Sequence, residues 1–261
     1  HIISFLWSEY KKKDFLLKDL KSNFITDFEY YLKTEKLFKQ NTIHKTIQRF
    51  RQVVKVAISL DYLQKDPFLL HKNPKPKKEI IFLNPEELKK LEEYNFSQRR
   101  LEQVRDMYIF CCYTGLAYNE MSKLQTKHIE VGFDDNNWIK IIREKTNKTL
   151  SIPLLPKSSM ILEKYHSNEK SHVLPVISNQ RFNSYLKEIA EIVGIEKNLT
   201  HHTARKTFAT TVLLYNDVPM EIVSELLGHS DMSITQSHYG KVVQTKVSEH
   251  ILKLGKKLNK K

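Results

Sequence analysis

The sequence predicts a mostly α-helical fold with one small β-sheet, an α+β protein built as two lobes. Apolar residues recur at helical spacing along most of the 261 residues. One stretch alternates instead with the period of a strand and is rich in β-branched residues, NNWIKIIREKTNKTLSIPL. A third observation divides the chain, because the segment HKNPKPKKE at 71–79 has the proline and lysine content of an exposed linker.

The first lobe, residues 1–70, is predicted to be a bundle of helices. It is dense in Leu, Ile, Phe, Tyr and Lys. The last of its helices is expected to stop at Asp66–Pro67, since proline cannot continue a helix. The expected helices lie near residues 1–11, 23–36, 41–60 and 60–66.

The second lobe, residues 80–261, begins with a well-marked helix start. Asn84 is a good N-cap, Pro85 suits the first helical position, and Glu86 and Glu87 lie in the first turn. Farther on, Thr200 is a second N-cap candidate. The other expected elements are a mostly apolar helix at 99–113, the hairpin around EKTNK, helices near 156–166 and 179–193, and a helix with Pro219 early and Gly228 as its stop.

The charge of the chain favours a polyanionic partner. The 43 Lys and Arg residues exceed the 30 Asp and Glu residues, giving a formal net charge of +13, which suits nucleic acid. Cys111 and Cys112 are adjacent in an apolar run, so we interpret them as core residues of a cytosolic protein, not metal ligands. No apolar run approaches the length of a membrane span. The chain starts at His1 inside a helical pattern, and we expect an upstream segment to be missing.

Five side chains of the second lobe form a candidate catalytic set. His202 and Arg205, at i and i+3, share one face of a helix. His229 follows the helix end at Gly228, Tyr239 comes ten residues later, and Lys145 lies at the tip of the hairpin. Each has an ordinary alternative. His202 and Arg205 could be surface residues on a DNA-facing helix, and His229 could be a common histidine after a helix end. Lys145 could be a solvated lysine, and Tyr239 a half-buried tyrosine with a satisfied hydroxyl.

Taken together, these residue types suit phosphoryl transfer without a metal. The transition state at a phosphodiester places negative charge on the non-bridging oxygens, and Arg, Lys and His are fixed donors for that charge. A tyrosine hydroxyl is a feasible nucleophile. We find no metal-ligand cluster, no phosphate-binding glycine-rich loop and no acidic pair at a catalytic spacing in a chain with only six glycines. The sequence therefore lacks the residues that metal-dependent nucleases and NTPases normally use.

The motifs HHTARKTFATTVLL and LLGHSD, with the tyrosine ten residues after the histidine, resemble the second conserved box of the tyrosine recombinases, also called phage integrases. TGLAYNEMSKL at 114–124 resembles their first box. The resemblance is strong over 80–250 and fainter over 1–70, which is similar to the helical core-binding domain of the family. The TGLAY variant and the Lys- and Asn-rich usage resemble integrases of Bacteroides-type conjugative transposons and related mobile elements.

The resemblance implies a role for each candidate. Tyr239 would be the nucleophile that forms a 3′-phosphotyrosyl link, and Arg205 and His202 would contact the scissile phosphate. His229 would bind a non-bridging oxygen or position the nucleophile, and Lys145 would be the general acid toward the 5′ oxygen. No cofactor, ATP or metal is implied. His238 matches no family position, so we expect it to pack or to face DNA.

The first box departs from the family pattern Thr-Gly-Leu-Arg-x-x-Glu. Ala117 stands where the second phosphate-binding arginine is expected, although Glu120 is present. Arg143 is a candidate replacement, since it lies two residues before Lys145 on the same strand face. Arg105 is another, but twelve residues of helix span about 18 Å. Either arginine could instead be an ordinary DNA-backbone or salt-bridge residue.

The resemblance further implies a clamp around double-stranded DNA, working as a homotetramer on two sites in the bacterial cytoplasm, at the nucleoid. Integration or excision of a mobile element is the expected role. A helix at 242–258 is expected to dock on a neighbouring subunit or to fold back on its own domain. Two alternatives stay open: a non-catalytic DNA-binding relative, which Ala117 favours, and a relaxing enzyme similar to type IB topoisomerases. The linker residues expected to bind DNA are Lys72, Lys75, Lys77 and Lys78.

Overall fold

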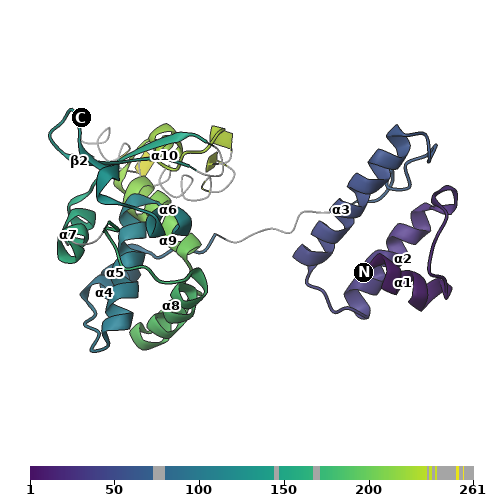
Figure 1. Ribbon diagram of the computed structural model, residues 1–261, viewed down its shortest axis with the longest axis horizontal. Helices are drawn as coiled ribbons and strands as arrows, with labels where there is room; N and C mark the ends of the chain where they lie inside the picture. The colour runs from purple at the N-terminus through teal and green to yellow at the C-terminus, as the bar shows by residue number, and fades with distance from the viewer. Residues whose placement is uncertain are drawn as a thin grey trace. The chain divides into compact units, whose positions relative to one another are not determined.

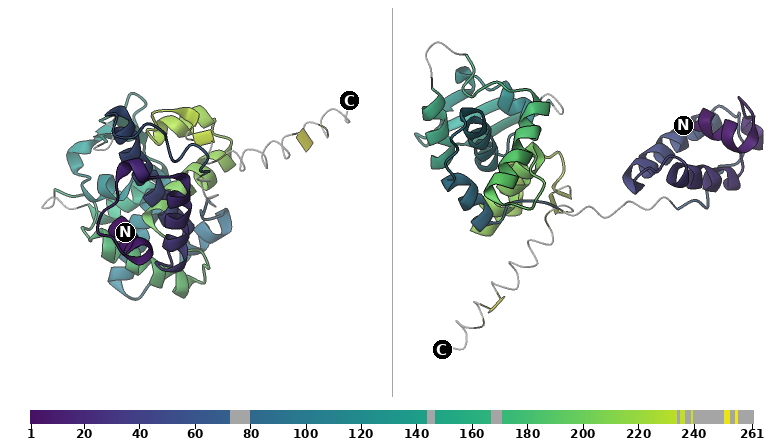
Figure 2. Two further views of the ribbon diagram at one scale, coloured as in Figure 1. Left: turned by 90° about the vertical axis from the view of Figure 1, so that its right-hand side faces the viewer. Right: turned by 90° about the horizontal axis from the view of Figure 1, so that it is seen from below.

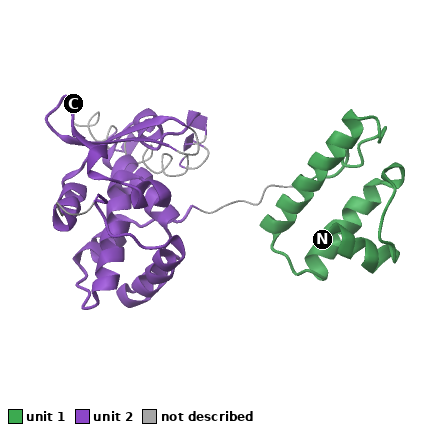
Figure 3. Ribbon diagram, in the orientation of Figure 1, with its two compact units in different colours: residues 1–79 green, residues 80–261 purple. Residues whose placement is uncertain are grey.

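The computed structural model divides the chain into two compact units, His1–Glu79 and Ile80–Lys261 (Figure 3). Each unit is described by itself. The mostly helical α+β fold class predicted from the sequence is confirmed. The structure describes residues 1–72, 80–143, 147–166, 171–233, 235–236, 239, 251–252 and 255.

The regular elements in the described part of unit 1 are all helices or helical turns. Its longest element is the amphipathic helix α3, Gln40–Ser59, which buries Ile43, Ile47 and Val54 on one side. The other elements are α1 (Ile2–Phe5), a π-helical turn at Leu6–Tyr10, a 3₁₀ turn at Leu17–Asp19 and α2 (Ser22–Thr34).

The core of unit 1 is rich in aromatic rings. Phe5 meets Phe24 edge-on with ring centroids 5.1 Å apart and lies 5.2 Å from Phe28. Such edge-to-face and tilted contacts are the preferred geometry of aromatic pairs. The helix predicted at 60–66 is wrong. Asp61 adopts a left-handed φ of 59°, and the amide of Tyr62 donates back to the Ala57 carbonyl, so the chain turns after α3.

Unit 2 is organised around helix α5, Arg99–Thr114, which contacts α4, α7, α8 and α9 (Figure 1, Figure 2). Every residue from Val104 to Cys112 is buried, as expected of a helix surrounded by other helices. Cys111 and Cys112 are free thiols in this core, as predicted. The surrounding helices are α4 (Pro85–Glu93), α6 (Tyr118–Ser122), α7 (Pro156–Tyr165), α8 (Asn179–Val193), α9 (His201–Thr207) and α10 (Met220–Leu226).

The sheet of unit 2 has three antiparallel strands in the order β1-β2-β3. The predicted hairpin is confirmed as β2 (Asn137–Ile142) and β3 (Thr149–Pro153), which pair Ile139 with Ile152 and Ile141 with Leu150. The sequence analysis missed β1 (Ile129–Val131), a three-residue strand that follows a 3₁₀ turn at Thr126–His128. Strand β3 contacts α10, so the hairpin lies against the helix that carries the Leu-Gly-His motif.

The predicted N-caps are confirmed. The Asn84 side chain accepts from the Glu87 amide at 2.8 Å, while Glu87 accepts from the Asn84 amide, forming a capping box. Thr200 caps α9, and the chain then continues as a π-helical turn at Phe208–Leu213 and a 3₁₀ turn at Leu214–Asn216. No helix in the described ranges is long and apolar enough to cross a bilayer.

Candidate active site

Arg205 lies where α5, α9 and α10 meet. Its Nη1 donates to the carbonyl of Gly115, just past α5, and its Nη2 donates to the carbonyl of Leu227, at the end of α10. Gly115 has a φ of 68°, and a side chain there would clash with the Phe208 ring. Glycine therefore both ends α5 and lets its carbonyl face Arg205.

Arg143 reaches the same place from the end of β2. Its Nε donates to Glu120 Oε1 at 2.8 Å, and its Nη1 donates to the carbonyls of Leu227 at 3.1 Å and Gly228 at 3.0 Å. The Arg143 and Glu120 side chains are only 12% and 11% exposed. Two guanidinium groups from different elements, Arg143 and Arg205, thus share the Leu227 carbonyl.

Glu120 connects Arg143 to the position of the missing arginine. Its Oε2 accepts from the Ala117 amide at 2.7 Å, while its Oε1 accepts from Arg143. This carboxylate therefore caps α6 and holds a guanidinium beside the start of that helix. The geometry brings the Arg143 side chain to the first-box segment, although it comes from the hairpin.

The electrostatics of the cluster follow from burial. Burial and the neighbouring charge of Arg143 together lower the pKa of Arg205 to about 10, while Glu120 and Tyr239 oppose the shift. A guanidinium with this pKa is still protonated at neutral pH. Since one carboxylate faces two guanidinium groups, the cluster carries an excess of positive charge.

Tyr239 is 5% exposed and packs in a hydrophobic cluster that includes Phe208, Val223 and Leu227. Burial raises the pKa of the Tyr239 phenol to about 12, and the charge of Arg205 acts in the opposite direction. The phenol is therefore protonated at neutral pH, and Arg205 is close enough to favour its ionised form.

The two motif histidines lie on the elements that carry the arginine cluster. His202 is exposed on α9, three residues before Arg205. His229 follows Gly228, whose φ is 58°, and its amide donates to the Ser224 carbonyl at 3.1 Å. The Nδ1 of His229 lies 2.7 Å from the Thr235 hydroxyl, a contact that orients the ring.

Arg105 is engaged elsewhere. Its Nε pairs with Asp106 at 2.6 Å, and its Nη1 donates to the carbonyls of Glu92 and Tyr94. Lys145 lies outside the described residues, although its strand neighbour Arg143 is described. Also outside are His238, the linker lysines Lys75, Lys77 and Lys78, and most of 242–258, whereas Lys72 is described and exposed.

Sequence reasoning missed the contacts of the site that residue type does not indicate. The Leu227 carbonyl accepts from both arginines, the Gly228 carbonyl accepts from Arg143, and the Thr235 hydroxyl orients His229. The glycine stop at Gly228 was a usable indication, because a helix end leaves carbonyls without partners. Among the described residues, no group of His, Cys, Asp and Glu could hold a metal ion.

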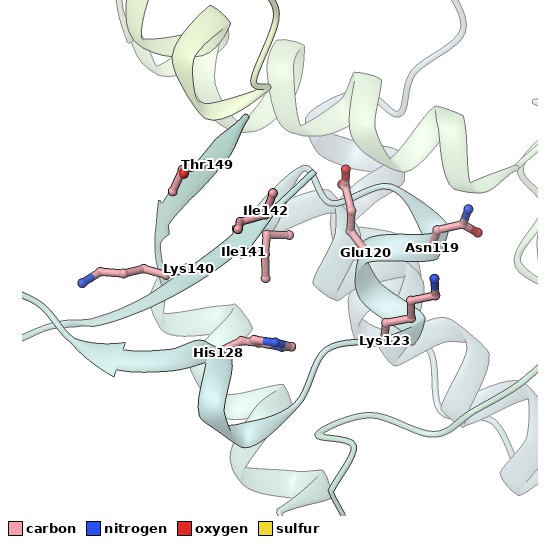
Figure 4. A pocket seen from close by; sticks show the side chains of 8 residues that line it. All are labelled: Asn119, Glu120, Lys123, His128, Lys140, Ile141, Ile142 and Thr149. Carbon is pink, nitrogen blue, oxygen red and sulfur yellow. The ribbon is translucent and has the colours of Figure 1, made fainter. Parts of the chain in front are cut away.

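A pocket of about 530 Å³ opens beside Glu120, between α6 and the sheet (Figure 4). His128 points into it, and its Nδ1 accepts from the Gln125 amide at 3.1 Å. The other lining residues are Asn119, Lys123, Lys140, Ile141, Ile142 and Thr149. Glu120, which binds Arg143, therefore borders an open space.

Comparison with known families defines the class. Residues 81–245 match the phage integrase family, and residues 1–78 match the phage integrase SAM-like domain. The chain belongs to the phage integrase family, the tyrosine recombinases. It is a site-specific recombinase, an enzyme that cleaves and rejoins DNA through a phosphotyrosine intermediate.

Individual relatives agree with this class. The chain is 29% identical to a tyrosine recombinase of Pseudothermotoga lettingae, over 90% of this chain and 83% of that protein. It is 29% identical to the tyrosine recombinase XerD of Staphylococcus haemolyticus, over 82% and 77% of the two chains. In fold it resembles the lambda integrase dimer bound to a COC' core site, with a TM-score of 0.70, 15% identity, and 90% and 85% coverage. The Tn1549 transposon integrase in complex with transposon right end DNA gives a TM-score of 0.70, 15% identity, and 94% and 91% coverage.

Proposed function

We propose that Tyr239 is the nucleophile of this recombinase and that Arg205 and Arg143 together bind the scissile phosphate. The proposal rests on the cluster in which both arginines donate to the Leu227 carbonyl. Both guanidinium groups are held by backbone carbonyls at the end of α10, and Arg205 acts electrostatically on the Tyr239 phenol. Fixed donors of this kind stabilise charge that develops in a transition state.

Arg143 takes the place of the first-box arginine in this proposal. The Glu120 carboxylate supports the assignment, because it binds the Ala117 amide with one oxygen and Arg143 with the other. Arg105 is the weaker candidate, since Asp106 and two backbone carbonyls already bind it. An ion-paired arginine that is fixed elsewhere would have to give up these contacts to bind a phosphate.

In the cleavage step, Tyr239 Oη attacks phosphorus and forms a 3′-phosphotyrosyl ester. The bond from phosphorus to the 5′ oxygen breaks, and Lys145 gives that oxygen a proton. The phenol proton passes to a solvent water as the new bond forms, and the positive charge of Arg205 favours this loss. His202 and His229 act on the non-bridging oxygens. Attack by another 5′ hydroxyl reverses the step, so the bond is conserved and neither ATP nor a metal ion takes part.

The assembly proposed is a homotetramer on two double-stranded DNA sites, with the lysines of the 71–79 linker on phosphates. Segment 242–258 would dock on a neighbouring subunit. In its described part, Ile251 and Leu252 are 61% and 65% exposed, which suits apolar residues that a neighbouring subunit would cover. The test is truncation at Val242. DNA cleavage without ordered multimers supports docking, and unchanged multimers would argue against it.

The cellular role proposed is integration or excision of a mobile genetic element in the bacterial cytoplasm. The resemblance of the first-box variant to conjugative-transposon integrases supports this role. The fold likeness to the Tn1549 transposon integrase is compatible with it.

The chemistry is tested with a suicide substrate, a DNA duplex from an element end nicked near the cleavage point. The wild type is expected to form a covalent complex on a denaturing gel with a chelator present, and Tyr239→Phe to bind the DNA without forming it. A requirement for a divalent ion, or a complex with the Phe variant, would contradict the proposal. DNA binding with no covalent complex in either protein would favour the non-catalytic alternative.

A further inference from the structure

His201, which the mechanism above does not use, lies directly against His202. These are the first two residues of α9, and their ring centroids are 4.0 Å apart with planes 37° from parallel. Behind His201, the Tyr118 ring lies 6.1 Å away and packs in turn 5.8 Å from Phe182. His201 is half-buried and His202 is exposed. The His201 ring thus lies between the Tyr118 ring and His202, the histidine proposed to contact the phosphate.

Several hydrogen bonds fix His201 and the residues around it. The amide of His201 donates to Asn183 Oδ1 at 3.3 Å, and Asn183 is held by two hydrogen bonds to Asn179, one turn earlier on α8. The Tyr118 hydroxyl donates to the Ile177 carbonyl. Because the surroundings of His201 are held from both α6 and α8, the ring offers a rigid surface to its neighbour.

The His201 ring stays uncharged near neutral pH. Burial lowers its pKa to about 4, with the proximity of His202 as the second cause. Among the described residues, the titratable groups that face it are His202 from α9 and Tyr118 from α6, whereas Asn183 and Phe182 from α8 are uncharged. The buried Nδ1 of His201 has no hydrogen-bond partner in the described part of the chain, as suits a neutral ring.

We propose that His201 is a positioning residue that fixes the His202 ring for its contact with the DNA phosphate and keeps an uncharged face beside it. This inference rests on the proposed role of His202. A second positive charge at this distance would disfavour protonated His202, while a neutral aromatic face tolerates it. Packing also restricts the rotamers of an exposed side chain, so less ordering is needed when the phosphate binds.

Three substitutions separate positioning from plain packing. His201→Phe keeps a neutral ring and is expected to retain the rate of covalent-complex formation within about 3-fold, whereas His201→Ala removes the surface and is expected to lower that rate about 10-fold. His201→Lys places a cation there and is expected to lower the pKa of His202 by about 1. The fall of the cleavage rate with rising pH should then occur at lower pH in the Lys variant.

Two independent readouts are needed. NMR titration of the His202 ring in the full chain without DNA gives its pKa, and single-turnover cleavage of the suicide substrate gives the rate, with circular dichroism showing that each variant is folded. An unchanged His202 pKa in the Lys variant together with an unchanged rate in the Ala variant would overturn the inference. If wild type forms no covalent complex but the His202 pKa responds as expected, the proposed function fails and the coupling of the two rings stands.

Discussion

Among the described residues of unit 2, largely buried arginines occupy the Arg105 site and the site built on Glu120. The difference between these two sites explains which of them suits a phosphate. At the Arg105 site, Asp106 also accepts from Lys164 at 2.7 Å, and Lys164 pairs with Glu102 at 2.5 Å. Cations and carboxylates are therefore balanced. At the site built on Glu120, one carboxylate accepts from Arg143 and lies near Arg205. Backbone carbonyls accept from Nη1 of Arg143 and from Nη1 and Nη2 of Arg205.

The comparison shows how a protein distinguishes a structural arginine from a functional one. A buried ion pair with matched charges holds helices together but has no charge left for a ligand. Carbonyls orient a guanidinium without neutralising it, so the excess charge is available to an anion. The carbonyls of Leu227 and Gly228 at the end of α10 therefore orient the guanidinium groups of Arg143 and Arg205.

The largest effect is expected at Arg205. Arg205→Ala should lower the rate of covalent-complex formation by about 10³-fold, because it removes the guanidinium that acts electrostatically on the nucleophile. Single-turnover cleavage of the nicked substrate measures this rate, with DNA binding followed separately. A loss below tenfold would mean that Arg205 is structural, like Arg105.

Arg105→Ala should act on folding instead. Asp106 would lose its Nε donor, and the carbonyls of Glu92 and Tyr94 would lose theirs, so we expect the free energy of unfolding to fall by about 3 kcal/mol. The cleavage rate per folded molecule should not change. Urea denaturation provides the measurement. Lys140→Ala is the control, since its ion pair with Glu130 is exposed and should contribute at most about 1 kcal/mol.

Gly228→Ala tests whether the backbone at the end of α10 positions the arginines. The φ of 58° is unfavourable for a side chain by about 1–2 kcal/mol, and the added Cβ would lie 3.1 Å from Arg143 Cδ. Gly194→Ala is the matched control, because Gly194 also ends a helix at positive φ but would meet only the Lys90 ammonium, at 3.3 Å. Both variants should lose similar stability in denaturant, and only Gly228→Ala should also lose cleavage. Equal cleavage by the two would separate Gly228 from the site.

The smallest effect concerns the Tyr239 phenol. Its pKa is raised to about 12 from the ordinary value of 10.0, so the protonated phenol stabilises the fold. This contribution is complete below pH 10.0 and is lost as the pH rises through about 12. Ultraviolet titration of wild type minus Tyr239→Phe isolates the group. A midpoint at the ordinary value of 10.0 in the folded protein would contradict this account.

Much of this arrangement could be predicted from the sequence, because local patterns specify local structure. The helix at 99–113, the hairpin and the caps at Asn84 and Thr200 follow from periodicity and capping chemistry. Strand β1 has only three residues, too few to show a period, and the helix expected at 60–66 is replaced by a turn at Asp61.

The site was only partly predictable for a different reason. The motif identified Tyr239 and Arg205 by residue type, but the acceptors of the arginines are backbone carbonyls, which any residue supplies. The choice between Arg143 and Arg105 depended on which side chain the tertiary fold brings to Glu120. Spacing along one chain does not specify such a contact between a hairpin and a short helix.

The central claim is that Arg143 replaces the arginine absent at Ala117, and a rescue experiment tests it most directly. Arg143→Ala should lower the single-turnover cleavage rate by about 10²-fold or more, the effect of losing one fixed donor. Adding Ala117→Arg to that variant should restore part of the rate, since it returns a guanidinium to the first-box position. Arg143→Ala that cleaves at the wild-type rate, with Arg105→Ala as the defective enzyme instead, would contradict the account.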